Sequence, residues 1–383
     1  MKRKIKVAHL ASFTGNLGDI ASHRGFRDWF ADTLGVVIEW SEFEIRDFYR
    51  QTSSFDQNLA KAWNLYDLVV IGGGNYLELW PENSRTGCSI DLPPELLSLI
   101  STPIYFNALG LDDGQGVSES ARENFSKFFN YAVTNKNILI SLRNDGSHET
   151  LVRVFPELES EKYYVTPDHG FFALQKSIHK QKVRVKERAV IGVNLAQDMP
   201  EFRFKESKSE FLKHFSNVLQ EIEFDKLIFF PHIFSDVGII YELLDVLPDD
   251  IRRSKCSIAP YGCRPEDVET LLNYYTSLDL MLAMRFHANI LPISIGIPTV
   301  GISSYPQISR LFKKLEIDEW VENIHEFGWS KRLVSKINKY YNDPEQAIFD
   351  FAKVQPEILR QRAAFSSSMS EWFESCGVSG EPV

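Results

Sequence analysis

The stretch LDLMLAMRFHANILPISIGIPTVGIS, residues 278–303, combines the two patterns of a parallel α/β sheet. Its apolar run over 280–283 predicts a buried strand, and the small and apolar residues over 288–295 predict a helix that packs on it. Arg285 and His287 lie between the two, where the strand ends and the helix begins. Free N–H groups and the positive end of the helix dipole make such a turn favourable for an anion. A buried arginine there requires a counter-charge, either from a carboxylate of the chain or from a ligand.

The rest of the chain repeats the order of strand and then helix. Strands are predicted over 6–11, 36–40, 68–71, 104–107, 138–142 and 163–165 in the first half, and over 190–195, 226–230 and 256–259 in the second. Amphipathic stretches lie between them, for example after Ser118, where Phe125, Phe128 and Phe129 share one helix face. This repetition predicts an α/β fold with two Rossmann-like domains, each a doubly wound parallel sheet.

The length of 383 residues suits two domains of roughly 150–200 residues each. The basic segment 176–188 has no clear period and is the predicted linker. We therefore expect an N-terminal domain over 1–178, a C-terminal domain over 186–330, and a helical segment over 331–383 that packs across both.

Charge and apolar content disfavour several classes of partner. Lys and Arg number 42 against 52 Asp and Glu, and this net charge of -10 argues against nucleic acid and anionic lipid as partners. No apolar run approaches the ~20 residues of a membrane span, and the apolar part of the N-terminus is too short for a secretory leader. The four cysteines show no zinc spacing, which fits a reducing compartment. A cytoplasmic protein without a bound metal is the expectation.

Polar turns follow several other predicted strands. In an open parallel sheet, ligands collect at the carboxyl ends of the strands, and the turns at those ends are FTGNLGD (13–19), GGGNYLEL (72–79), RNDGSHETL (143–151), PDHGFF (167–172) and PHIFSD (231–236). Each turn also has a purely structural interpretation. Asp168 and Asp236 suit helix caps, and His232 suits a packed turn. Arg143 suits an ion pair with a carboxylate such as that of Glu149.

Taken in order, these turns resemble the polysaccharide pyruvyl transferase family. The matching pieces are GNLGD, DLVVIGGGNYLEL, SLRNDGSHETL, the PD of VTPDHGFF, FPHIFSD, and RFHANILPISIGIPTVGISSYPQISRLF at 285–312. The Arg-x-His turn, followed by the small-residue helix and the Gly-x-Pro strand, is the most specific of them. The resemblance implies a GT-B-like arrangement of the two domains. It also implies transfer of pyruvate from phosphoenolpyruvate to two hydroxyls of one sugar as a ketal, in polysaccharide or cell-surface glycan biosynthesis, without a cofactor.

The resemblance assigns donor binding and catalysis to Arg285 and His287. Arg285 would clamp the phosphate and His287 would act as the general acid. The implied substrate-binding positions are Asn16, Gly18, Asp19, Gly72, Gly73, Gly74, Asn75, Arg143, Asp168 and His232. Three of these, Asp19, Asp168 and His232, are candidates for the general base or for positioning the sugar hydroxyls. The glycine loop is expected to face the sugar acceptor.

The sequence departs from the family pattern where the second domain opens. Its first strand reads GVNLAQD, where an arginine that grips the donor is expected. Arg143, Arg203 and Arg264 are the candidates to replace it. Two other functions stay open on the same fold: a GT-B glycosyltransferase that uses a nucleotide sugar, and a non-catalytic glycan-binding protein. The acceptor sugar, its glycan, lipid or nucleotide carrier and the oligomeric state are also open.

Overall fold

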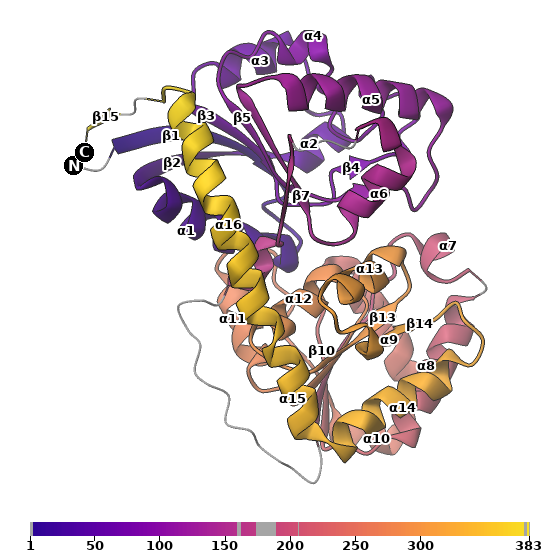
Figure 1. Ribbon diagram of the computed structural model, residues 1–383. Helices are drawn as coiled ribbons and strands as arrows, with labels where there is room; N and C mark the ends of the chain where they lie inside the picture. Colours follow the sequence, from indigo (N-terminus) through magenta and orange to yellow (C-terminus); the bar gives the residue numbers. More distant parts are fainter. Residues whose placement is uncertain (1–2, 159–161, 174–188, 206, 379–380, 383) are drawn as a thin grey trace. The chain divides into compact units, whose positions relative to one another are not determined.

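The contacts within the chain divide it into two compact units. The computed structural model describes residues 3–158, 162–173, 189–205, 207–378 and 381–382 (Figure 1). Unit 1 comprises Met1–Phe13, Ser22–His169 and Leu359–Val383, and unit 2 comprises Thr14–Ala21 and Gly170–Ile358. The predicted linker, with the boundaries expected at 178 and 186, lies outside the described residues.

Unit 1 is built on a parallel sheet. Six strands pair in parallel in the order β2-β1-β3-β5-β7-β8, and β15 joins β1 antiparallel. Their bounds are β1 Arg3–Ala11, β2 Val36–Glu44, β3 Leu68–Gly72, β5 Ile104–Leu109, β7 Ile138–Arg143, β8 Tyr164–Thr166 and β15 Glu381–Pro382. A separate small sheet pairs β4 (Leu77–Glu78) with β6 (Leu111–Asp112).

Helices follow the strands of unit 1, as the alternating sequence predicts. They are α1 Leu17–Leu34, α2 Ile45–Tyr49, α3 Gln57–Trp63, α4 Pro94–Leu97, α5 Glu119–Thr134, α6 Ser147–Val154, and the 3-10 turns η1 Pro156–Leu158 and η2 His169–Phe172. Residues 17–21 of α1 and 170–172 of η2 belong to unit 2. Ser118 caps α5 by accepting a hydrogen bond from the backbone N of Ala121, and Phe125, Phe128 and Phe129 lie on its buried face. The helix predicted from that face is therefore confirmed.

Unit 2 holds a second parallel sheet, in the order β11-β10-β9-β12-β13-β14. The strands are β9 Val190–Asn194, β10 Lys226–Phe229, β11 Cys256–Ile258, β12 Leu280–Ala283, β13 Thr299–Ser303 and β14 Val321–Asn323. The helices between them are α7 Pro200–Arg203, α8 Lys208–Glu221, α9 Phe234–Val246, α10 Asp249–Lys255, α11 Asp267–Tyr275, α12 Phe286–Ser294, α13 Pro306–Lys314 and the 3-10 turn η3 Asp318–Trp320. This sheet confirms the second Rossmann-like domain.

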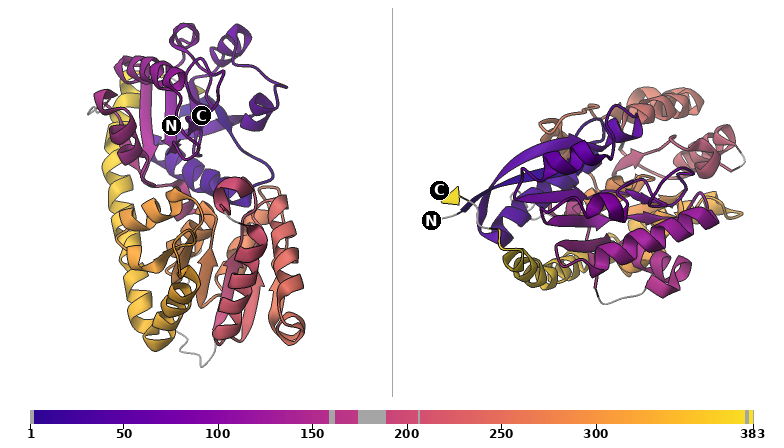
Figure 2. Two further views of the ribbon diagram at one scale, coloured as in Figure 1. Left: turned by 90° about the vertical axis from the view of Figure 1, so that its right-hand side faces the viewer. Right: turned by 90° about the horizontal axis from the view of Figure 1, so that it is seen from above.

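Each sheet is covered on both faces, as a doubly wound sheet requires. Alternate residues of β10 show this pattern. Leu227 and Phe229 belong to one apolar cluster, whereas Ile228, together with Phe230 just after the strand, belongs to the cluster on the opposite face. Figure 2 shows helices on the two sides of each sheet. Inner strands such as β3 and β12 are buried on both faces and are therefore continuous apolar runs, which is the sequence pattern that predicted them. The edge strands β2 and β11 are only partly buried.

The C-terminal segment is helical, as expected. It consists of α14 (Trp329–Asn342), α15 (Pro344–Ala352) and α16 (Val354–Ser375). Phe365, Met369 and Phe373, spaced by four residues on α16, pack into the unit 1 cluster that also contains Ile5 and Val7. Among the described residues, no helix is both long enough and apolar enough to cross a bilayer.

Candidate functional site

Arg285 lies at the carboxyl end of β12, where its backbone caps α12. Its guanidinium is paired with two carboxylates of unit 2. Nε donates to Asp236 Oδ2 at 2.7 Å and Nη2 donates to Asp236 Oδ1 at 2.5 Å, while Nη2 also reaches Asp198 Oδ1 at 2.6 Å. The side chain is 11% exposed. Burial alone lowers the pKa of Arg285, but Asp236 and Asp198 outweigh burial and raise that pKa above its usual value.

Asp236 holds Arg285 from the first turn of α9. The sequence suggested Asp236 as a helix cap, but the N-cap of α9 is Ile233, and Asp236 lies three residues further, inside the first turn. From inside that turn, Asp236 Oδ2 accepts hydrogen bonds from the backbone N of His232 and of Ile233, at 2.9 Å and 3.2 Å. The Asp236 side chain is fully buried. It is the counter-charge within the chain that a buried arginine requires.

Asp198 joins Arg285 to a second arginine. Arg203 Nη2 donates to Asp198 Oδ2 at 3.2 Å, and Arg203 Nη1 donates to Ser304 Oγ at 3.1 Å. Burial favours a raised pKa for Asp198, but Arg285 and Arg203 together lower it below its usual value, so this carboxylate is ionised at neutral pH. Asp198 is 32% exposed, in contrast to the buried Asp236.

The three arginines considered for a second donor contact have different surroundings. Arg203 lies beside Arg285 through Asp198, as described above. Arg264 is 73% exposed and pairs with Glu266 at 3.8 Å. Arg143 belongs to unit 1. Arg203 is therefore the only one of these three that shares a carboxylate with Arg285.

His287, in the first turn of α12, is held by the turn between β1 and α1. Its Nδ1 lies 3.4 Å from Asp19 Oδ1, and the side chain is 7% exposed. Asn16 Nδ2 donates to Asp19 Oδ2 at 2.9 Å, and Asn16 Oδ1 accepts from the backbone N of Gly18 at 3.0 Å. A Cβ on Gly18 would lie 2.4 Å from the Cβ of His287. The glycine of this turn therefore permits the close approach of His287, and three predicted site residues gather around that histidine.

His232 is fully packed at the end of β10. Its Nε2 lies 2.7 Å from the hydroxyl of Tyr275, and its backbone O accepts from the backbone N of Leu17 at 3.2 Å. Burial, and after it the positive charge of Arg285, lowers the pKa of His232 well below its usual value. His232 is therefore neutral at neutral pH and a weak base.

In unit 1, the three glycines at the end of β3, Gly72 to Gly74, differ in what surrounds them. Gly72 has φ +114, and a Cβ there would lie 2.4 Å from the backbone O of Asn107. A Cβ on Gly74 would lie 2.5 Å from the ring of Tyr76, whose hydroxyl accepts from the backbone N of Ser12. Gly73 has only ordinary contacts, the nearest at 3.6 Å. Internal packing thus requires Gly72 and Gly74, and it does not require Gly73.

Buried polar groups surround Gly73. A Cβ on this glycine would lie nearest to Asn107 Nδ2 and Ser22 Oγ. Within the described residues, Asn107 Nδ2 has no hydrogen-bond partner although it is buried, whereas Oδ1 of the same side chain bonds to His169 Nε2 at 2.9 Å. Asn75, next along the loop, donates from Nδ2 to Asp112 Oδ2 at 2.9 Å. The polar side chains at this edge of the sheet are therefore mostly held by one another.

Arg143 and Asp168 form a buried ion pair at the ends of β7 and β8. Arg143 Nη1 lies 3.4 Å from Asp168 Oδ2, and Arg143 Nε donates to Asp145 Oδ2 at 2.7 Å. Ser22 Oγ donates to Asp168 Oδ1 at 3.2 Å. The arginine side chain is 2% exposed. This contact with two buried carboxylates differs from the solvated surface pair that the sequence suggested as the structural interpretation.

Sequence reasoning did not single out Glu78, on β4. Ser89 Oγ donates to Glu78 Oε2 at 2.7 Å. Burial raises the pKa of Glu78 to about 7, and the neighbouring carboxylate of Asp112 adds to the rise. A titratable group with a pKa near neutrality is a recurrent feature of functional sites. Its sequence signal was one acidic residue within the apolar NYLEL stretch.

Two buried histidines of unit 1 were also missed. His9 Nε2 lies 2.7 Å from the backbone O of Gly72, and His23 Nε2 lies 3.0 Å from the backbone O of Ser12. Burial, with His23 and Arg27 nearby, lowers the pKa of His9 well below its usual value. For His9, the sequence signal was a histidine inside the apolar strand VAHLA. In the part of the chain that the structure describes, no group of three His, Cys, Asp or Glu side chains is arranged to hold a metal ion.

The turns described here are shared with a known family. A sequence profile of the polysaccharide pyruvyl transferase family matches residues 16–305, well over half of the chain. The chain belongs to this family. The match extends from Asn16 to Tyr305, so Arg203, Arg285, His287 and the glycine loop all lie inside it. Membership in the polysaccharide pyruvyl transferase family makes the protein a transferase.

Solved structures share the fold at low identity. The chain is similar to HepE from Anabaena, solved in complex with UDP and glucose, at 12% identity and a TM-score of 0.57, covering 97% of this chain and 100% of HepE. It is also similar to a UDP-N-acetylglucosamine 2-epimerase assigned in Listeria monocytogenes, at 11% identity and a TM-score of 0.57, covering 96% and 97% of the two chains. MnaA of S. aureus, solved with UDP, matches at 10% identity and a TM-score of 0.52, over 92% and 91%. These structural similarities establish a GT-B-like fold. A comparison of the sequence with curated proteins found no match.

Proposed function

We propose that the protein transfers pyruvate from phosphoenolpyruvate to two hydroxyls of one sugar, forming a ketal. Family membership supports the transfer of pyruvate. The observation that carries the proposal is the arrangement of unit 2, where His287 is held by Asp19 and lies two residues beyond an arginine bound to carboxylates. A histidine and a cation at one turn suit a reaction that needs a proton donor beside a dianionic phosphate.

In the proposed reaction, His287 donates a proton to the methylene carbon of phosphoenolpyruvate. The adjacent carbon gains cationic character, and one sugar hydroxyl attacks that carbon and loses its proton to a base. The bond from the carbon to the phosphate oxygen then breaks, and inorganic phosphate leaves with the bonding electrons. The second hydroxyl attacks the carbon and closes the ketal, and its proton passes to the departing phosphate. The proton that the base takes from the first hydroxyl balances the one that His287 gives to the methylene carbon.

Asp19 is the positioning residue for His287 in this scheme. A carboxylate beside Nδ1 favours the tautomer with the proton on that nitrogen and fixes the orientation of the ring. Nε2 is then the nitrogen that exchanges the catalytic proton. Asp168 and Asp19 remain candidates for the base, whereas the lowered pKa of His232 makes that residue the weakest of the three candidates.

Arg285 and Arg203 are the proposed cations for the phosphate and carboxylate of the donor. Both already contact Asp198, which is partly exposed, so an incoming anion would compete with Asp198 for them. Asp236 is buried and would stay in place as the counter-charge of Arg285. The contacts of HepE with UDP and glucose, and of MnaA with UDP, support a sugar or a nucleotide-linked sugar as the acceptor class. The cytoplasmic location and the lack of a cofactor stay predictions.

The test is phosphate release from phosphoenolpyruvate in the presence of a panel of free, nucleotide-linked and polymeric sugars. We expect His287→Ala to abolish release and Asp19→Asn to reduce it, with the melting temperature of each variant close to that of the parent. Near-parental turnover by His287→Ala would overturn the assignment. Thermal stabilisation by UDP- or GDP-sugars alone, and not by phosphoenolpyruvate, would instead favour a nucleotide-sugar glycosyltransferase.

A further inference from the structure

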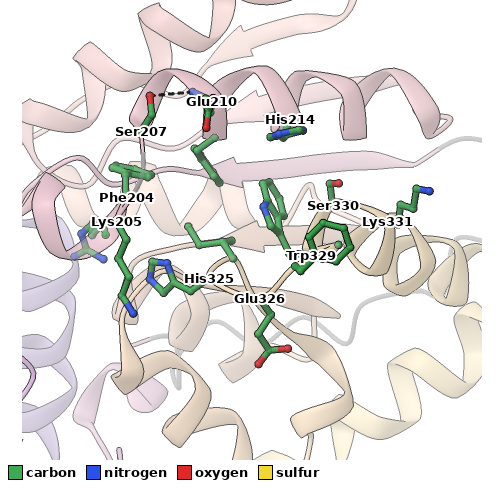
Figure 3. A pocket seen from close by; sticks show the side chains of 15 residues that line it. Phe204, Lys205, Ser207, Glu210, His214, His325, Glu326, Trp329, Ser330 and Lys331 are labelled. Atoms are coloured by element: carbon green, nitrogen blue, oxygen red, sulfur yellow. Dashed lines mark hydrogen bonds between the residues drawn. The ribbon is translucent and has the colours of Figure 1, made fainter.

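A separate pocket lies at the edge of unit 2 where β14 ends. It has a volume of about 630 Å³, within the roughly 300–1,000 Å³ typical of small-molecule sites. The beginnings of α8 and α14 and the loop that joins β14 to α14 enclose it (Figure 3). Of the site residues named from the sequence, Arg203, a candidate for the second donor arginine, lines this pocket.

One side of the pocket is aromatic. Phe211 and Trp329 stack with ring centroids 5.4 Å apart and an interplanar angle of 18°, and Phe204 lies 5.1 Å from Phe211. Phe204 and Phe211 are buried, whereas the indole of Trp329 is only partly buried, and Phe327 on the rim is fully exposed at 102%. The exposed ring of Phe327 offers apolar surface that a ligand in the pocket can cover. Partly exposed aromatic rings suit the apolar face of a sugar ring.

Cationic side chains lie at the ends of the pocket. Figure 3 shows Lys205 beside His325 at one end and Lys331 at the other. Across the described ranges, neither lysine forms an ion pair, in contrast to Lys208 nearby, which pairs with Glu242 at 2.6 Å. The positive charge of Lys205 reaches His325, because it contributes, after burial, to the lowered pKa of that histidine. Lysines without an ion pair in the described part of the chain are notable on a protein whose net charge is -10.

Two carboxylates and two hydroxyls also line the pocket. Glu326 is engaged by Arg332 at 3.3 Å, so its charge is partly compensated. Glu210 and Ser207 lie at the beginning of α8, and Ser207 Oγ accepts from the backbone N of Glu210. Ser330 lies opposite them, in the first turn of α14 (Figure 3). These groups offer hydrogen bonds to the hydroxyls of a sugar, as polar groups do around an apolar wall in ligand sites.

We propose that this pocket binds a sugar unit that carries a negative charge, with its ring against Trp329 and its carboxylate or phosphate beside Lys205 and His325. The pocket adjoins the proposed donor site through Arg203, which lines the pocket and bonds to Asp198, the partner of Arg285. The role assigned to it rests on the proposed function: the occupant is an acidic unit of the acceptor next to the sugar that receives pyruvate. Binding itself does not depend on that role.

The experiment measures the binding of four probes to the full chain by ligand-observed NMR, without phosphoenolpyruvate. The probes are glucuronic acid, glucose 6-phosphate, glucose and inorganic phosphate. We expect at least one of the two acidic sugars to bind at least about tenfold more tightly than glucose and than phosphate. Whether the carboxylate or the phosphate binds more tightly distinguishes the two sources of charge. Equal binding of glucose and both acidic sugars would overturn the proposal, and so would binding of phosphate as tight as that of glucose 6-phosphate.

Variants locate the site. Lys205→Ala should weaken the acidic sugars by about tenfold and leave glucose unchanged, whereas Phe327→Ala should weaken all three sugars by several-fold. Phe327 is fully exposed, so its replacement does not threaten folding. Lys213→Ala is the matched control, because Lys213 is an exposed lysine on α8 that does not line the pocket. Unchanged binding in Lys205→Ala, or equal loss in Lys213→Ala, would overturn the assignment. Sugar binding without any pyruvyl transfer would retain the pocket and reject the proposed function.

Discussion

Replacing Asp236 with asparagine is expected to destabilise unit 2 severely. The substitution keeps the shape of the side chain but removes the charge that faces Arg285 at 2.5 Å and 2.7 Å. Breaking a buried ion pair by neutralising one partner costs roughly 3–5 kcal/mol, because the other charge is left uncompensated. Asp198 still holds Arg285 at 2.6 Å, so we expect the lower end of that range, about 3 kcal/mol.

The free energy of unfolding in urea measures this effect, with Arg285→Met and the double variant completing a mutant cycle. The double variant removes both charges and should recover at least about 2 kcal/mol relative to the sum of the single changes. Asp249→Asn is the control, because Asp249 pairs with Arg252 at 2.8 Å on the surface and is 62% exposed. Its cost should stay below about 1 kcal/mol. A cost below about 1 kcal/mol for Asp236→Asn as well would refute the reasoning.

The same cycle separates the structural role of Arg285 from its proposed role in catalysis. If the arginine serves only to neutralise Asp236, the double variant regains stability and phosphate release together. If Arg285 also binds the donor, stability returns and release does not. The second outcome is the one that the proposed function requires.

Two further predictions concern Gly18 and Glu78. Gly18→Ala places a Cβ 2.4 Å from the Cβ of His287 and therefore displaces the histidine. Phosphate release should fall by about a hundredfold, while the circular dichroism spectrum stays that of the parent. Parental phosphate release in this variant would contradict the prediction. The pKa of Glu78 rises from 4.5 to about 7 on folding, so the unfolded chain loses this proton at a lower pH than the folded chain. The free energy of unfolding therefore falls as the pH rises between these two values. The fall is at most about 3 kcal/mol, and Glu78→Gln should remove it when urea unfolding is compared at about pH 5 and about pH 8.

The sheets were predictable because each strand has its own local signal. The runs LVVIG on β3 and LMLA on β12 are buried on both faces and end at turn residues, so periodicity alone locates them. Strand order has no such signal. The order β10-β9-β12 brings the ends of three strands together, and with them Asp236, Asp198 and Arg285. These residues are up to 87 positions apart in the chain, so the counter-charges of Arg285 were not predictable.

The partner of His287 escaped prediction for a related reason. Strand and helix alternation assigns the GNLGD turn to the first domain, but the contacts of Thr14–Ala21 belong to unit 2. Leu17 and Ile20 pack into the same apolar cluster as Ala288 and Leu291 of α12. The GNLGD motif was recognised from its residues. Its contact with His287 depends on where the short segment Thr14–Ala21 packs. Tertiary contacts of this kind leave no periodic pattern in the sequence.

Asp198 offers a test of the proposed donor site that does not remove a cation. It is 32% exposed and engages both Arg285 and Arg203, so a phosphate at these arginines has to displace it, whereas the buried Asp236 stays. Asp198→Asn weakens the competitor, and phosphoenolpyruvate should therefore bind more tightly, by about tenfold if about 1.4 kcal/mol of competition is relieved. Titration calorimetry with phosphoenolpyruvate measures this gain, and Asp249→Asn controls for the change in net charge. Weaker binding in Asp198→Asn would mean that the carboxylate orients the arginines for the donor instead of competing with it.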